Sequence, residues 1–88
     1  MGSKEAYDTI RRALASNPRT SIVDCIYDDA AFGNFVIAFE VEGRPRSVVN
    51  DRGELTLCSD LAGTRKCATV LPSIADADEQ TLVEALNL

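Results

Sequence analysis

The spacing of apolar residues changes along the chain, and each change predicts a different kind of element. In residues 3–16 the apolar positions recur at the intervals of one helical face; they are Ala6, Tyr7, Ile10, Ala13 and Leu14. Ser3 is a residue type that caps helices, so we expect it to start this one. Asn17 precedes a proline and should end it, because the residue before proline avoids the helical conformation.

Beyond Pro18 the period becomes two, which is the period of a β-strand. Residues 34–42 show it most clearly, since apolar Phe35, Ile37, Phe39 and Val41 occupy every second position. Further strands are predicted at residues 20–28, 46–50 and 54–60, with one more if Ala62-Gly63 is a hairpin turn. Residues 51–53 have glycine last, which predicts a three-residue loop with a glycine bulge.

The last segment, residues 72–88, starts with proline and is typical of a helix, whose apolar stripe is Leu82, Val83 and Leu86. Asp76 and Glu79 have the spacing of a capping box at its start. The whole pattern predicts a single α+β domain over residues 1–88. It consists of an N-terminal helix, an antiparallel meander of four to five strands and a C-terminal helix, with both helices on one face of the sheet.

Two of the three cysteines lie in the stretch "CSDLAGTRKC". A two-residue turn at Ala62-Gly63 places Cys58 opposite Cys67, on the sheet face away from Leu55 and Leu57. Such a non-hydrogen-bonded pair has its Cα atoms about 4.5 Å apart, which permits a disulfide. We expect free thiols in a reducing cytoplasm, with a reversible redox pair as the alternative.

The same reasoning about register also predicts how the apolar residues pair. The loop at residues 51–53 would place Val49 beside Leu55, and the last hairpin would place Leu55 opposite Val70. We therefore expect one apolar row, made of these three residues, across three strands.

The charge is distributed unevenly. The chain has 14 carboxylates and nine lysines and arginines, giving a formal charge of −5, which argues against nucleic acid as a partner. A meander places alternate turns at opposite ends of the sheet. One end, which we call the acidic end, should gather seven carboxylates: Asp28, Asp29, Asp51, Glu54, Asp76, Asp78 and Glu79. Turns and helix starts favour aspartate in any protein, but such a surface can also dock a basic partner.

Several chemistries lack the residues they need. The chain has no histidine, so it has no Ser–His or Cys–His nucleophile pair, and three cysteines are too few for an ordinary zinc site. Neither a glycine-rich phosphate loop nor a twelve-residue calcium loop is present. We expect no enzymatic activity, no metal and no cofactor. The apolar runs are too short to span a membrane and no leader is visible, so we expect a cytoplasmic protein.

Residues 39–61, "FEVEGRPRSVVNDRGELTLCSDL", resemble the strand–turn–strand part of type III secretion chaperones. That resemblance implies a small acidic α/β protein, commonly dimeric, that binds the extended segment of an effector. The chain departs from those chaperones because it has no obvious helix between its strands.

Taken together, the sequence predicts a small protein-binding module of the inhibitor, immunity-factor, adaptor or chaperone type. It would act through the acidic end on a protein with a basic surface, as a monomer or homodimer, and without nucleic acid or membrane. The alternatives are a thiol redox protein that uses Cys58 and Cys67, and a binder similar to the type III secretion chaperones.

Overall fold

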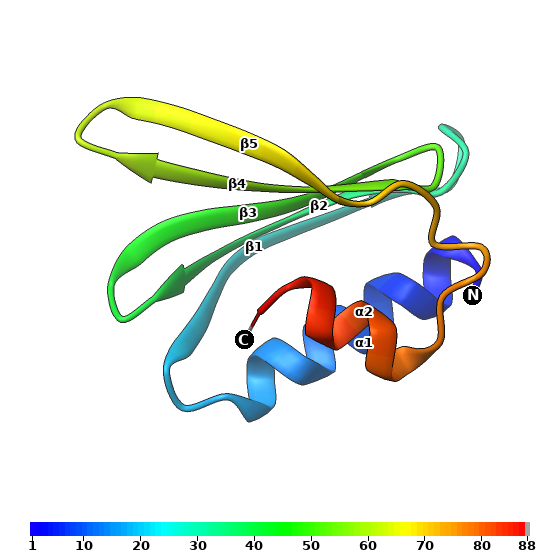
Figure 1. Ribbon diagram of the computed structural model, residues 1–88, viewed down its shortest axis with the longest axis horizontal. Helices are drawn as coiled ribbons and strands as arrows, with labels where there is room; N and C mark the ends of the chain where they lie inside the picture. The colour runs from blue at the N-terminus through cyan, green and yellow to red at the C-terminus, as the bar shows by residue number, and fades with distance from the viewer. Residues whose placement is uncertain (88) are drawn as a thin grey trace.

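The computed structural model describes residues 1–87 and, of Leu61, the backbone alone. The chain forms, in order, α1 (Ser3–Ser16), β1 (Thr20–Asp28), β2 (Asn34–Val41), β3 (Arg44–Asp51), β4 (Glu54–Leu61), β5 (Thr64–Leu71) and α2 (Glu79–Ala85). The strands form one antiparallel sheet in the order β1-β2-β3-β4-β5. Both helices lie on one face of that sheet, so the predicted fold class is confirmed (Figure 1).

The core lies between the sheet and the two helices. α1 packs against β1 and β2, while α2 packs against β5 and against α1. We call the sheet face that the helices cover the inner face and the opposite face the outer face. The fully buried apolar side chains of the sheet are on the inner face; they are Phe35, Ile37, Phe39, Val48 and Leu55. The side of β2 that was predicted to be buried is therefore confirmed.

The first helix presents the predicted stripe to the core, with Ala6, Ile10 and Leu14 fully buried. Asn17 is its C-cap, as predicted. The predicted N-cap is wrong, because Gly2 occupies the cap position and Ser3 is the first helical residue. Ser3 lies instead against Gly33 in the turn between β1 and β2, and its hydroxyl accepts a hydrogen bond from Asn50 Nδ2 on β3 at 3.5 Å.

The second helix is much shorter than the predicted segment. Residues 72–78 form a loop, because the N–H of buried Ile74 donates a hydrogen bond to the carbonyl of Gly53 and so holds the loop against the sheet. The cap is Asp78, whose Oδ1 accepts a hydrogen bond from the N–H of Thr81 at 2.7 Å, and the predicted capping box at Asp76 is wrong. Leu88, the last residue of the predicted segment, lies outside the described residues.

The three tight hairpins share one turn geometry. Glu42-Gly43, Arg52-Gly53 and Ala62-Gly63 all have positive φ at both residues, as in a two-residue type I′ turn. The prediction at Ala62-Gly63 is confirmed. The predicted three-residue loop is wrong, because Arg52 adopts a left-handed conformation and Asp51 pairs directly with Glu54.

The shorter turn changes the pairing of Leu55. This residue faces Asn50 on β3 and Leu71 on β5, with a register shift between Leu55 and Thr56. The predicted apolar row of Val49, Leu55 and Val70 is therefore wrong. Val49 lies on the outer face instead, where it pairs with Val36 and Thr56.

Candidate protein-binding surface

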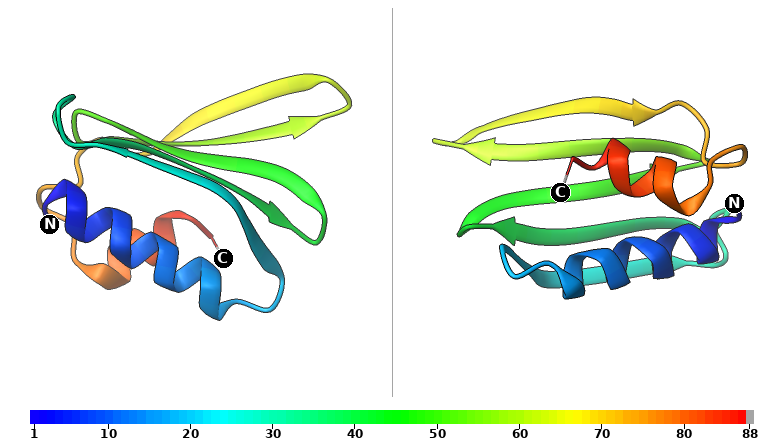
Figure 2. Two further views of the ribbon diagram at one scale, coloured as in Figure 1. Left: turned by 180° about the vertical axis from the view of Figure 1, so that it is seen from behind. Right: turned by 60° about the horizontal axis from the view of Figure 1, so that its bottom comes forward.

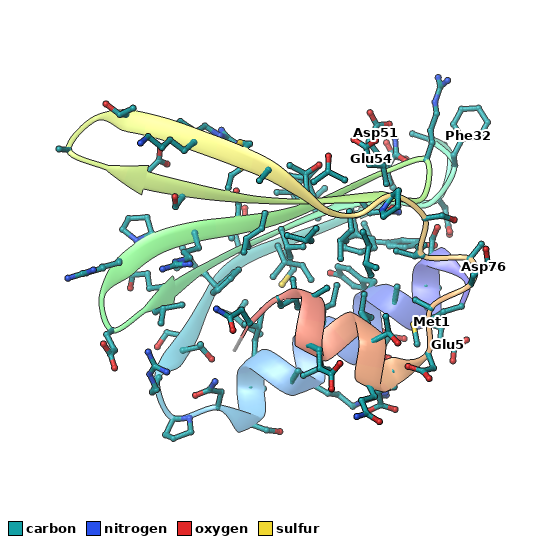
Figure 3. The ribbon with its side chains drawn as sticks, viewed as in Figure 1. Met1, Glu5, Phe32, Asp51, Glu54 and Asp76 are labelled. Atoms are coloured by element: carbon teal, nitrogen blue, oxygen red, sulfur yellow. A yellow bond between two sulfur atoms is a disulfide. The ribbon has the colours of Figure 1, made fainter. Side chains whose placement is uncertain are left out.

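The segments that carry the carboxylates of the acidic end lie together in the structure. The turn between β1 and β2, the turn between β3 and β4, and the loop before α2 all lie at one end of the sheet (Figures 1 and 3). All seven carboxylates that the sequence assigned to the acidic end are exposed: Asp28, Asp29, Asp51, Glu54, Asp76, Asp78 and Glu79. The structure therefore brings the predicted residues to one end of the molecule.

Within this end the carboxylates form two groups. Asp51 and Glu54 lie beside Phe32 at the tip of the sheet, whereas Asp76 lies near Met1 and the start of α1 (Figure 3). Asp28, the last residue of β1, belongs with the sheet group because it pairs with Asn34 next to the same tip, and Asp29 follows it in that turn. Asp78 and Glu79 belong with the loop and the start of α2. The single acidic surface predicted from the sequence is therefore a sheet group and a helix group.

Two of these carboxylates have local structural duties. Asp78 caps α2. The pKa of Asp78 is held below its usual value by hydrogen bonds from Thr81, of which the bond from the backbone N–H has the larger effect and the bond from the side chain the smaller. Asp28 Oδ1 accepts a hydrogen bond from the N–H of Ala30 at 3.0 Å, which is an Asx turn. Turn and cap chemistry thus explains part of the acidic end, as the ordinary interpretation of the sequence expects.

Turn chemistry does not explain Phe32. Its side chain is 72% exposed, and its backbone has a φ of 59°, which is uncommon for a bulky residue. The guanidinium carbon Cζ of Arg52 lies 4.9 Å from the centre of its ring, in cation–π contact. Reasoning from the sequence missed Phe32, although an aromatic residue directly before the glycine of "DDAAFGN" was the available signal.

The next residue, Gly33, explains why Phe32 points outward. Gly33 is buried and has a φ of 68°. A Cβ at this position would lie 2.7 Å from Ser3 Cβ and 2.9 Å from the hydroxyl oxygen of Tyr27. The backbone of the turn is thus pressed against the start of α1, which leaves the aromatic ring on the solvent side.

Hydrogen bonds connect the loops of the acidic end to one another. Asn50, only 1% exposed, donates from Nδ2 to the carbonyl of Gly33 at 3.2 Å and accepts at Oδ1 from the N–H of Gly53 at 3.0 Å. The N–H of Arg52 donates to Asn34 Oδ1 at 2.8 Å. Because the loop before α2 is bonded to Gly53 as well, three separate loops form one connected platform under Phe32. Such a surface loses little conformational freedom on binding.

The outer face of the sheet continues from this platform, and within residues 1–87 neither helix covers it (Figure 2). The strand registers align its side chains in rows across the sheet. One row is made of Ile26, Val36, Val49, Thr56 and Thr69. We call its three branched apolar members, Ile26, Val36 and Val49, the apolar row.

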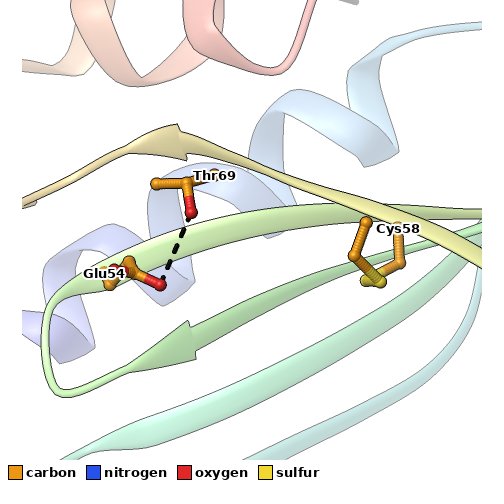
Figure 4. Close-up of a disulfide and its surroundings, with 4 residues drawn as sticks. Glu54, Cys58 and Thr69 are labelled. Carbon is orange, nitrogen blue, oxygen red and sulfur yellow. Dashed lines mark hydrogen bonds between the residues drawn. A yellow bond between two sulfur atoms is a disulfide. The ribbon is translucent and has the colours of Figure 1, made fainter.

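The Cys58–Cys67 pair lies on the same outer face. The two residues are directly opposite each other, with their Cα atoms 4.1 Å apart, so the predicted hairpin register is confirmed. The prediction of free thiols is wrong, because the sulfur atoms form a disulfide (Figure 4). A non-hydrogen-bonded pair brings opposing side chains close enough for that bond. Cys58 is buried and Cys67 is exposed, while the third cysteine, Cys25, is free and half-buried.

Figure 4 also shows how one carboxylate of the sheet group is held. Glu54 Oε1 accepts a hydrogen bond from the hydroxyl of Thr69, on the neighbouring strand, at 3.5 Å. This hydrogen bond links Glu54 on β4 to Thr69 on β5 across the outer face.

Within residues 1–87, no group of three or more histidine, cysteine, aspartate or glutamate side chains is arranged to hold a metal ion. Over the same residues, neither helix has the length and apolar character needed to cross a membrane. Comparisons of the chain with protein-family models, with curated proteins and with solved structures found no match.

Proposed function

We propose that this protein is a small non-enzymatic module that binds a basic protein through the acidic end. The observation that carries the proposal is Phe32, an exposed aromatic ring on a hydrogen-bonded platform, with Asp51 and Glu54 beside it. Aromatic residues on rigid surfaces are common anchors of protein interfaces, and surrounding charges of one sign select a partner of the opposite sign.

The charges at this end also limit what the partner can be. Phosphate groups of nucleic acid would be repelled by the carboxylates, which supports a protein partner. A second copy of the chain facing the same end would meet the same carboxylates, so a homodimer that uses this end is disfavoured as well. A lysine- or arginine-rich surface gains from both Phe32 and the carboxylates.

The proposal is tested with a charge-reversed bait. The variant combines Asp28→Lys, Asp51→Lys and Glu54→Lys, and it is compared with the wild-type protein in affinity capture from cells of the source organism. We expect the wild-type protein to capture a partner in a salt-sensitive manner and the variant to lose it, because charge steering and attraction both reverse. Circular dichroism checks that the variant is folded.

A matched control carries the same change in net charge elsewhere. It combines Asp8→Lys, Glu42→Lys and Glu84→Lys, three exposed or half-buried carboxylates away from the sheet group. This control should retain the partner. A partner that binds both baits equally well would contradict the proposal.

The disulfide favours a second candidate function, which is thiol redox chemistry at Cys58 and Cys67. A thiolate of a reducing protein would attack the exposed Cys67 sulfur, form a mixed disulfide and release the Cys58 thiolate. A second thiolate of the reductant would then attack the reductant's own sulfur in the mixed disulfide, so that the reductant leaves with a disulfide and Cys67 leaves as a thiolate. This function requires rapid and reversible reduction by a dithiol protein, which stopped-flow fluorescence can measure; resistance to reduction would contradict it.

The cytoplasmic location that the sequence predicts can be tested through the oxidation state of Cys58 and Cys67. In a reducing cytoplasm the pair would be kept as thiols, whereas an oxidising compartment would keep the bond. Acid quenching of living cells, followed by thiol alkylation and mass measurement, counts the free thiols directly. A cytoplasmic protein should carry three alkylated cysteines, and a single alkylated cysteine would contradict that location.

A further inference from the structure

We propose that the outer face of the sheet is the docking site for a basic amphipathic helix of the partner protein. This inference rests on the proposed function, and it names the surface beside Phe32 that the partner covers and the kind of element that covers it.

The outer face carries more exposed apolar side chains than is usual for the solvent-exposed face of a sheet. Its exposed side chains include Val23 at 64%, Ile26 at 58% and Val36 at 37%. In an antiparallel sheet with one covered face, the open face is normally polar. Here Ile26, Val36 and Val49 are directly paired across three neighbouring strands, so the apolar residues are contiguous.

The size of this area matches one helix. Three adjacent strands span about 10 Å at a strand spacing of about 4.8 Å, and a helix with its side chains is about 10–12 Å across. The neighbouring row toward the other end of the sheet contains the small residues Ala38 and Ser47, which pair with each other. A line of small side chains next to a line of branched ones leaves room for a rounded element.

Two shallow hollows lie along β2, and Val36 borders both of them. The one nearer the acidic end has a volume of about 430 Å³ and is lined by residues that include Ile26, Val49, Asp28 and Asp51. The other has a volume of about 350 Å³, and its lining includes Val23 and Ala38. Two hollows in line along a strand can receive two apolar side chains from successive turns of one helix.

The charged residues around the hollows determine which charge the docking helix should carry. Asp28 and Asp51 line the hollow nearer the acidic end, without a lysine or arginine among its lining residues. The second hollow has carboxylates at Glu40 and Asp60 and arginines at Arg46 and Arg65. The net sign is negative, so lysines and arginines should flank the apolar stripe of the helix. A second copy of this face and an anionic membrane are both repelled by the same carboxylates.

The probe for the test is a synthetic 18-residue helix with leucines on one face and lysines on the other, measured against a version with glutamates in place of the lysines. Binding is followed by fluorescence anisotropy and by chemical-shift changes in ¹⁵N-labelled protein. We expect the lysine helix to bind, with the largest shifts at Ile26, Val36, Val49 and Phe32. We expect at least tenfold weaker binding of the glutamate helix.

Variants identify the surface. Val36→Lys should weaken binding of the lysine helix at least tenfold, because it places a cation between the two hollows. Ala15→Lys, an exposed position on α1, adds the same charge elsewhere and should change the affinity by less than twofold. Equal affinity of the Val36→Lys and Ala15→Lys proteins for the lysine helix would overturn the proposal. Chemical-shift changes confined to the helices would also overturn it. So would changes confined to the free edge of β5, because they would indicate an extended segment that pairs with β5 as an additional strand.

The same variants separate this inference from the proposed function. The natural partner could fail to bind the Asp28→Lys, Asp51→Lys, Glu54→Lys protein and still bind the Val36→Lys protein as strongly as the wild-type protein. In that case the acidic end binds the partner, and the proposed helix site on the outer face is wrong. If the natural partner binds both baits as well as the wild-type protein, the proposed function itself fails.

Discussion

The buried side-chain amide of Asn50 donates a hydrogen bond to the backbone carbonyl of Gly33, 17 positions earlier in the chain, at a distance of 3.2 Å. Its oxygen accepts from the N–H of Gly53. One side chain thus fixes the turn that carries Phe32 relative to the turn that carries Arg52. The proposed binding platform depends on this buried polar residue, which lies beside the apolar core.

Replacing that amide should be costly. Asn50→Ala leaves the Gly33 carbonyl and the Gly53 N–H without their partner, and a buried unsatisfied group costs about 1–3 kcal/mol. We expect a loss of that size in the free energy of unfolding, measured in urea, and faster amide exchange at Gly53. Asn34→Ala, which removes a less buried bond to Arg52, is the matched control and should cost less. Equal losses would show that Asn50 has no special role.

A second prediction concerns the close approach at Gly33. Gly33→Ala meets both a φ of 68° and a Cβ contact of 2.7 Å with Ser3, so it should destabilise the protein by about 2–4 kcal/mol. Gly43→Ala is the control, because Gly43 has a φ of 81° and open space around it. It should cost only the left-handed conformation, about 1–2 kcal/mol. Similar costs at both positions would contradict the close packing.

The core of the sheet gives a third prediction. Phe39 is buried on the inner face, and Phe39→Ala should lower the free energy of unfolding by about 3–5 kcal/mol. Val23→Ala, at an exposed position in the β1 bulge region, should change it by less than about 0.5 kcal/mol. A cost below about 1 kcal/mol for Phe39→Ala would mean that this ring is not part of the core.

The disulfide gives a fourth prediction. It closes a loop with a sequence separation of nine, so its reduction should lower the free energy of unfolding by up to about 3 kcal/mol. Amide exchange should accelerate in residues 59–66, the end of the hairpin beyond the bond. The double variant Cys58→Ser, Cys67→Ser should show no response to reductant. A wild-type protein that is equally stable with and without reductant would refute this expectation.

Lowering the pH should destabilise the start of α2. Hydrogen bonds from Thr81 keep the pKa of Asp78 below its usual value in the folded protein. A depressed folded pKa contributes stability above the unfolded pKa of about 4, and that contribution is lost as the pH falls through the folded pKa. We therefore expect amide exchange and chemical shifts of residues 79–85 to report fraying of α2 in acid. Asp78→Ala should show the frayed helix at neutral pH and no further response of this kind.

The sequence was sufficient for much of this fold, and the errors have physical causes. The pairing of β4 with β5 followed from one turn, Ala62-Gly63, and placed Cys58 against Cys67 correctly. The same logic failed at Arg52-Gly53, because a final glycine suits both a two-residue and a three-residue loop. The choice depended on arginine adopting a left-handed backbone.

The start of α2 was missed for a different reason. The local sequence from Pro72 onward permits a helix, but tertiary contacts of Ile74 with the sheet hold that segment as a loop. Prediction of the binding surface was limited in the same way. The acidic residues could be placed by topology, whereas the apolar row appears only once the registers of β1, β2 and β3 are known.

The meander has a consequence for how the protein forms. Each strand pairs only with the strand before or after it in the chain, so most sheet contacts join residues that are near in sequence. Proteins dominated by such local contacts fold rapidly. The contact between α1 and α2 has a much longer range than these hairpins, because it joins elements from the two ends of the chain. We therefore expect the hairpins to form early and the docking of α2 onto α1 to complete folding, with mutations at Leu82 affecting the unfolding rate more than the folding rate.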